Sequence, residues 1–232
     1  MTRAQDVASN LTVVRRRIET ACLAAGRDPG EVTLVVVTKF FPASDVRLLA
    51  DLGVTHVGEN RHQEAQAKAA ECADLGLRWH FIGGLQSNKA AAVASYADVV
   101  ESVDRAKLVG PLSRGAHERS HDVDVLLQVS LDPPGAGQRA GAEPDALVDL
   151  ASRVAEAGML HLRGLMAVAP LGEDAERAFA RLAEIRAGFL ERHPDADVLS
   201  AGMSGDLEHA VTHGATHVRV GSAVLGPRPA VQ

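Results

Sequence analysis

A lysine stands directly after the first strongly apolar run of the chain, in the stretch VVVTKFF over residues 35–41. A run of valines is typical of a buried strand, and Lys39 follows it among apolar neighbours. Partial desolvation by Phe40 and the valines favours the neutral amine, which can condense with an aldehyde to a Schiff base. The alternative interpretation is a strand-end lysine that extends its ammonium into solvent.

Two glycine-serine turns near the end of the chain provide a second kind of chemistry. GMSGDLEHA (202–210) leads from a small-residue turn into a helix, and its pattern predicts Ser204 as the N-cap. VGSAVLG (220–226) repeats the arrangement with Gly221 and Ser222 before a short apolar helical turn. Backbone N–H groups at helix starts and serine hydroxyls bind phosphate, although each turn alone has an ordinary cap as its alternative. A phosphate cradle facing a Schiff-base lysine is the arrangement that pyridoxal 5′-phosphate needs, so we predict this cofactor.

Arg219 is the third candidate residue of the site. In the stretch HVRV, alternation places Val218 and Val220 on one face of a strand and Arg219 on the other, toward the interior near the mouth. A buried arginine requires an acceptor, and a pyridine nitrogen, a phosphate or the carboxylate of Glu59 would serve.

Apolar strand patterns alternate with amphipathic helical patterns along the chain and must position these residues. We predict strands over 32–38, 55–59, 78–83, 98–102, 122–130, 161–168, 197–202 and 216–221. Helical spacing covers 44–52, 60–75 and 173–192, and a further helix over about 5–25 precedes the first strand.

This alternation favours an α/β fold, a single (β/α)8 barrel, over the doubly wound sheet that is its runner-up. Active sites of such barrels form where strands end, which is where Lys39 and both serines lie. No break in composition suggests a linker, so we expect one domain over 1–232 with an extra N-terminal helix and no second domain. The stretch 132–144, rich in proline and glycine, reads as a mobile loop.

Composition excludes several classes of protein. The chain has 232 residues, a net charge of −6 and only 3% aromatic residues, which argues against a nucleic-acid partner. Neither a signal peptide nor a membrane-spanning stretch is visible, and two cysteines do not make a disulfide framework, so we expect reduced thiols and a cytoplasmic location without membrane partners. The pairs His117/His121 and His209/His213 have metal-ligand spacing but no third ligand in sequence, so we predict no metal site.

Six stretches of the chain match the motifs of a known family. They are VVVTKFFP around Lys39, VGENRHQE (57–64), WHFIGGLQSNK (79–89), RGLMAVAP (163–170), GMSGDLEHA (202–210) and VRVGSAVLG (218–226). On these motifs the chain resembles the pyridoxal phosphate homeostasis proteins, whose barrel is similar to the N-terminal domain of alanine racemase and is of the fold type III kind. The resemblance covers nearly the whole chain.

The resemblance implies a role for each matching residue. Lys39 would hold pyridoxal phosphate covalently and Arg219 would face the pyridine nitrogen. The remaining positions would bind the phosphate or line the cofactor pocket; they are Ser204, Gly221 and Ser222 for the phosphate, and Asn60, His80 and Met166 for the pocket.

The resemblance also implies a non-catalytic carrier that binds, buffers and delivers the cofactor, with apo forms of pyridoxal phosphate enzymes as candidate recipients; we expect a monomer. The main alternative is an amino-acid racemase or a related fold type III enzyme. Racemisation needs a base on each face of the substrate, and the one tyrosine of the chain, Tyr96, lies away from the expected mouth. A further alternative is an aldolase that uses Lys39 as its Schiff base without the cofactor.

Overall fold

Eight parallel strands close into a barrel in the computed structural model, which describes residues 2–132 and 140–227. Each strand pairs with the next in chain order, and the last strand returns to the first, with Val35 opposite Arg219. The strands are β1 (Thr33–Val37), β2 (His56–Glu59), β3 (Arg78–Phe81), β4 (Val99–Val103), β5 (Val123–Gln128), β6 (Leu160–Met166), β7 (Val198–Ser200) and β8 (His217–Val220). The predicted (β/α)8 barrel is confirmed, and the doubly wound alternative is wrong.

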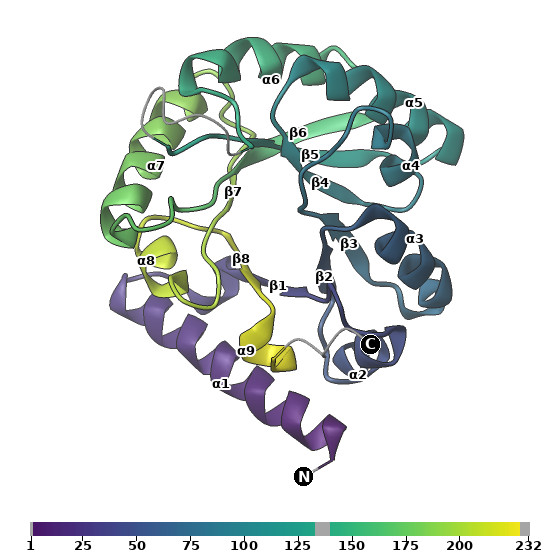
Figure 1. Ribbon diagram of the computed structural model, residues 1–232. Helices are drawn as coiled ribbons and strands as arrows, with labels where there is room; N and C mark the ends of the chain where they lie inside the picture. The colour runs from purple at the N-terminus through teal and green to yellow at the C-terminus, as the bar shows by residue number, and fades with distance from the viewer. Residues whose placement is uncertain (1, 133–139, 228–232) are drawn as a thin grey trace.

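Helices surround the barrel on its outer side (Figure 1). They are α1 (Arg3–Ala24), α2 (Ala43–Asp51), α3 (His62–Glu71), α4 (Ala90–Ala94), α5 (Val109–Arg119), α6 (Leu147–Ala155), α7 (Ala175–Leu190), α8 (Leu207–Thr212) and α9 (Ser222–Leu225). The helix predicted over 60–75 ends earlier, because the chain tightens into a 3₁₀ turn at Ala73–Leu75 and then adopts left-handed backbone at Gly76.

The N-terminal helix α1 does not follow a strand. Apolar residues recur along it every three or four positions, and the resulting stripe of Val7, Leu11, Val14 and Ile18 is buried. Its first turn is closed by a capping box in which the side chain of Thr2 accepts from the backbone N–H of the third helical residue. The helix crosses the outside of α8 and α9 (Figure 1).

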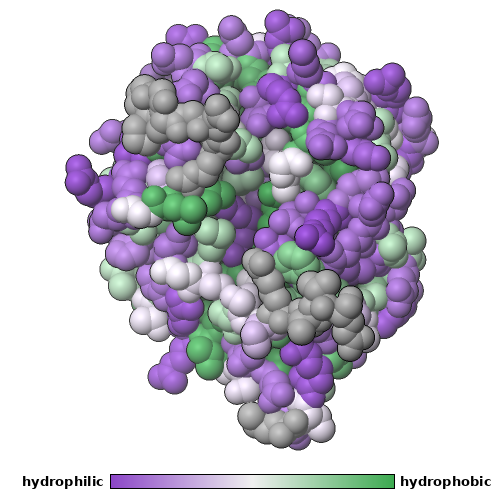
Figure 2. Space-filling view, in the orientation of Figure 1, coloured by the Kyte–Doolittle hydropathy of each residue, from purple (hydrophilic) through white to green (hydrophobic). Residues whose placement is uncertain are grey.

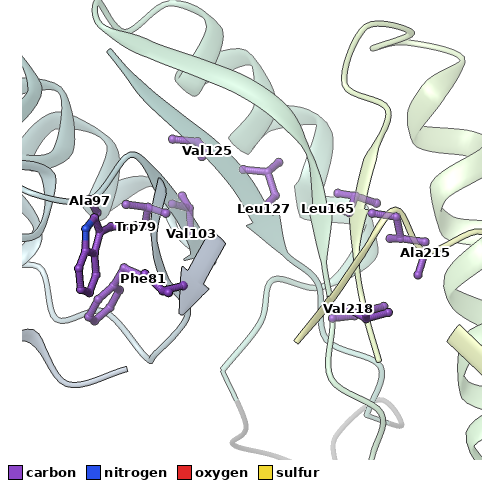
Figure 3. Packing of buried hydrophobic residues seen from close by; sticks show 14 of the residues in the cluster. Trp79, Phe81, Ala97, Val103, Val125, Leu127, Leu165, Ala215 and Val218 are labelled. Atoms are coloured by element: carbon purple, nitrogen blue, oxygen red, sulfur yellow. The ribbon is translucent and has the colours of Figure 1, made fainter. Parts of the chain in front are cut away.

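The strands carry two different faces because successive side chains alternate. One face packs against the helices and is apolar, with Trp79, Phe81 and Val218 among its buried members (Figure 3). The other face fills the barrel interior. A Cβ atom added at Gly58 would lie 3.1 Å from the Val35 side chain and 3.6 Å from that of Val37, so both valines face inward.

The outer surface is largely hydrophilic on the side shown in Figure 2, where apolar residues form small separate patches. No helix in the described part of the chain combines the length and the apolar character needed to cross a membrane.

Candidate functional site

Lys39 lies in a tight turn directly beyond β1. The backbone N–H of Phe41 donates to the carbonyl of Thr38 at 3.0 Å, which closes the turn around the half-buried lysine. Phe40 has a φ of 71°, in the left-handed region that bulky residues rarely adopt. Such strain persists only where surrounding contacts hold it, and here the Phe40 N–H donates to the carboxylate of Glu64 at 2.6 Å.

A buried cluster of three charged side chains, Lys68, Glu59 and Glu64, binds the same turn. The ammonium of Lys68 lies 2.5 Å from the Glu59 carboxylate and 2.8 Å from that of Glu64, and it donates to the Thr38 carbonyl at 2.7 Å. The Thr38 hydroxyl donates to Glu59 at 2.6 Å. Burial raises the pKa of Glu59, although the charge of Lys68 opposes this shift. Lys68, buried in this cluster, is therefore a structural cation that holds the turn carrying Lys39.

The turn that carries Ser204 differs from the sequence prediction. Helix α8 begins at Leu207 with Asp206 before it, so the prediction that Ser204 is its N-cap is wrong. The physical reason is the side chain of Asp206, which accepts a 2.6 Å hydrogen bond from the Met203 N–H and holds residues 203–206 as a separate turn. Gly202 enters this turn with a φ of 89°, and an added Cβ there would meet the Ala210 methyl at 2.6 Å.

The turn after β8 agrees with its prediction. Helix α9 begins at Ser222, and the carbonyl of Gly221 accepts from the N–H groups of Val224 and Leu225 at 2.9 Å each. Gly221 packs against β1, since an added Cβ would lie 3.2 Å from the Val37 carbonyl oxygen. The second glycine-serine turn thus lies beside the end of the strand that precedes Lys39.

One cavity of about 310 Å³ brings five of the predicted site residues together. Its lining includes Lys39, Ser204, Arg219, Gly221 and Ser222, together with Phe40 and Phe41. A lysine, two serines and an arginine therefore line one space at the carboxyl ends of β1, β7 and β8. This combination can hold a small anion that also carries a carbonyl group.

Arg219 points into the barrel as expected, but its acceptors were not anticipated. Its guanidinium donates to the Ser200 hydroxyl at 2.6 Å and to the Ala167 carbonyl at 2.9 Å, and it lies 3.8 Å from the Glu101 carboxylate. Glu59, offered above as an acceptor, is instead bound by Lys68. Burial lowers the pKa of Arg219, while the charge of Glu101 opposes this shift.

Glu101 joins Arg219 to a group of histidines inside the barrel. It is fully buried, lies 2.7 Å from His80 Nδ1 and accepts from the Ser200 hydroxyl at 2.6 Å. Burial alone would raise its pKa, but the contact with His80 and the charge of Arg219 outweigh burial and hold the pKa of Glu101 at about 2. The other nitrogen of His80 lies 2.9 Å from His56 Nδ1. A continuous polar chain therefore runs from the start of β2 to Arg219 at the cavity.

His217 lies near His56 and His80, with ring centroids 6.1 Å from each. Burial, followed by the charges around it, lowers the pKa of His217 to about 4, although Glu101 opposes the shift. The pKa of His56 is lowered to about 4 as well, chiefly by burial and then by the neighbouring histidines. Both rings are therefore neutral at neutral pH.

Three of the eight predicted site residues do not line the Lys39 cavity. His80 and Met166 are buried deeper in the barrel, each with about 2% of its surface exposed. Asn60 lines a neighbouring cavity of about 490 Å³ with Arg61 and Lys89, and its side-chain oxygen is buried with no hydrogen-bond partner among the described residues. Contact of these three residues with a cofactor stays a prediction.

The remaining sequence predictions have simple outcomes. His209 and His213 both contact Glu176 on α7 at 2.8 Å, and within the described residues no cluster of three or more ligands could hold a metal ion. Cys22 and Cys72 are buried free thiols. Residues 133–139 of the predicted loop over 132–144 lie outside the described residues.

Comparison with known proteins places this barrel in the class of alanine racemase-like barrels. Residues 7–229 match the family model described as alanine racemase, N-terminal domain. Among solved structures, PipY of Synechococcus elongatus with pyridoxal phosphate bound superimposes with a TM-score of 0.81 at 36% identity, covering 95% of this chain and all of that one. A protein of Bifidobacterium adolescentis gives a TM-score of 0.86 at 33% identity, covering 96% of this chain and 95% of that one.

Curated relatives identify the family within this class. The pyridoxal phosphate homeostasis protein of Pseudomonas aeruginosa is 44% identical and that of Escherichia coli 38%, with at least 96% of both chains covered in each comparison. The corresponding protein of Mycobacterium tuberculosis is 43% identical over 97% of this chain and 94% of its own length. The chain belongs to the family of pyridoxal phosphate homeostasis proteins.

Proposed function

We propose that this protein binds pyridoxal 5′-phosphate at Lys39 and acts as a carrier in the homeostasis of that cofactor. The distribution of lysines carries the proposal. The chain has four lysines, and Lys39 lines the cavity that also contains both glycine-serine turns. Lys68 is buried in ion pairs, Lys89 lines the neighbouring cavity, and Lys107 is exposed.

The residues of the cavity fit this cofactor by their chemistry. Bound pyridoxal phosphate supplies an aldehyde carbon that a lysine amine attacks reversibly, with loss of one water. The Lys39 amine would be the nucleophile, and the hydroxyls and backbone of Ser204 and Ser222 would hold the phosphate. Arg219 would donate toward the pyridine nitrogen. A guanidinium does not give up its proton, so this contact leaves the ring a weak electron sink and suits storage better than carbanion chemistry.

The racemase alternative requires a second base facing the same cavity. Tyr96, the one tyrosine of the chain, is buried between α4 and β4, where its ring stacks on His62 at 5.8 Å. Burial raises the pKa of Tyr96 above its ordinary value, and the charge of Glu59 adds to this shift. The position of Tyr96 and its raised pKa therefore make it a poor base for taking a proton from an amino acid bound at Lys39.

The test adds pyridoxal phosphate to the purified protein and follows near-visible absorption. We expect a coloured adduct in the wild type and in Lys107→Arg, and none in Lys39→Arg, which keeps the charge but forms no Schiff base. Borohydride reduction followed by peptide mapping should place the adduct at residue 39. A protein that pyridoxal phosphate fails to colour, or an adduct retained in Lys39→Arg, would contradict the proposal.

A second measurement separates the carrier from the enzyme. The loaded protein is incubated with L- and D-alanine in heavy water, and exchange of the α-proton is followed by NMR. We expect no exchange above the rate with free pyridoxal phosphate. Exchange at catalytic rates would make the racemase alternative the better one.

A further inference from the structure

Helix α1 stands outside the repeating strand-helix pattern, yet it contacts the Ser204 turn and helix α9, the two segments that carry the glycine-serine sides of the Lys39 cavity. It crosses α8 and α9, the helices that follow the two glycine-serine turns (Figure 1). Its basic run at residues 15–17 reads in the sequence as a solvated helix face. The structure shows that this reading does not hold for Arg17.

Arg17 binds the turn that carries Ser204. Its Nη2 donates to the backbone carbonyl of Ser204 at 3.0 Å. The same guanidinium holds the Glu208 carboxylate on α8 through two bonds, of 2.7 Å from Nε and 2.9 Å from Nη2. A bidentate pair of this kind fixes direction as well as distance. The main chain at Ser204, a residue that lines the cavity, is thus connected to α1.

The other half of the cavity is connected to the same helix. The Arg3 guanidinium donates to the Leu225 carbonyl at 2.9 Å while Asp45 on α2 binds its other edge. Asn10 donates from its side chain to the Val224 carbonyl at 3.1 Å. These bonds hold the end of α9, the helical turn that begins at Ser222.

Backbone hydrogen bonds join the ends of β7 and β8 as far as Gly202, whose carbonyl accepts from the Arg219 N–H at 2.9 Å. Strand β7 has three residues, and its paired register with β8 consists of Ser200 opposite His217. Residues 203–206 lie beyond this ladder, and the side chains of Arg17 and Asp206 bind their backbone.

We propose that α1 positions the phosphate-binding half of the cofactor cavity, with Arg17 as the positioning residue for the Ser204 turn. This inference rests on the proposed function, since it takes the anion to be the phosphate of pyridoxal phosphate. Arg17 acts through the backbone of Ser204 and does not itself line the cavity.

The test compares Arg17→Met with Arg16→Met. Methionine keeps the apolar stem of the side chain and removes the guanidinium. Arg16 is the exposed neighbour on α1, and no hydrogen bond or ion pair of its side chain is found within residues 2–132 and 140–227, so its variant has the same change of charge without the contact. Dissociation constants are measured for pyridoxal phosphate and for pyridoxal, which lacks the phosphate.

We expect Arg17→Met to weaken binding of pyridoxal phosphate about tenfold, the effect of losing about one hydrogen bond from the displaced turn to the phosphate, and to leave pyridoxal binding unchanged. Arg16→Met should bind both compounds as the wild type does. Equal weakening of both compounds would show a general effect on folding, and equal behaviour of the two variants would show no role for Arg17; either result would overturn the inference.

Hydrogen exchange without any ligand separates this inference from the proposed function. Backbone amides of residues 203–206 should exchange faster in Arg17→Met than in Arg16→Met. Unchanged exchange would refute the positioning role even in a protein that binds pyridoxal phosphate. Faster exchange in a protein that fails to bind it would support α1 as the support of this turn and refute only the cofactor. Glu208→Gln, which weakens the same pair with little change of shape, provides a second variant should Arg17→Met not fold.

Discussion

The buried pair of Glu101 and Arg219 leads to a quantitative prediction about stability. Arg219 is 4% exposed and Glu101 fully buried, with 3.8 Å between the Nη1 and Oε2 atoms. The change Glu101→Gln keeps the shape of the side chain and removes its charge, which leaves the guanidinium buried without its nearest anion. Removing one partner of such a pair costs about 3–5 kcal/mol, a large part of the roughly 5–15 kcal/mol that stabilises a typical domain.

The lowered pKa of Glu101 gives a magnitude for all the contacts of its carboxylate together, those with His80 first and those with Arg219 and Ser200 after them. Its pKa lies at about 2 in the folded protein against an ordinary 4.5, which corresponds to about 3 kcal/mol. Because the folded pKa is the lower one, this stability is fully present above pH 4.5 and is lost as the pH falls toward 2. The wild type should therefore lose about 3 kcal/mol more than Glu101→Gln across that range.

The assay is urea unfolding of the wild type, Glu101→Gln, Arg219→Gln and the double variant at neutral pH. Each single change should lower the free energy of unfolding by about 3–5 kcal/mol, and the double variant should lose clearly less than the sum, by at least about 1 kcal/mol. Purely additive losses, or single losses below about 1 kcal/mol, would refute the idea that Glu101 compensates the buried guanidinium.

Three further changes test other parts of the site. In urea unfolding, the wild type should lose about 3 kcal/mol more than His217→Asn between pH 6.5 and 4, because the unfolded histidine binds a proton near 6.5 and the folded one only near 4; parallel curves would contradict this. Gly202→Ala should lose at least about 1 kcal/mol in thermal unfolding, whereas Gly205→Ala in the same turn, where an added Cβ meets nothing within 4 Å, should be neutral; equal melting would refute it. Lys68→Met should lose about 3–5 kcal/mol at neutral pH and less at acid pH, where the buried Glu59 becomes protonated; a deficit that does not change with pH would argue against this ion pair.

The barrel and five residues of its cavity could be predicted because the signals are local. Strand-helix alternation identifies a parallel sheet covered by helices, and residues directly after strands gather at one end of it. Lys39, Ser204 and Ser222 each follow an apolar run closely, so the sequence could predict that they line one cavity. The start of α8 was predicted two residues too early, because a hydrogen bond from the Met203 N–H to the Asp206 side chain decides where that helix begins.

The partners inside the barrel and the contacts of α1 were decided by tertiary structure. Glu101 and Ser200 are 99 residues apart and meet only because the barrel closes. A single charged residue within the apolar pattern of β4 was the one available signal for Glu101, and it does not say which residue lies opposite. Arg17 likewise reads as a solvated arginine in sequence, since its contact with Ser204 spans 187 residues. Periodicity determines which face of each element is buried, whereas the pairing of those faces depends on how the closed barrel places distant strands and helices side by side.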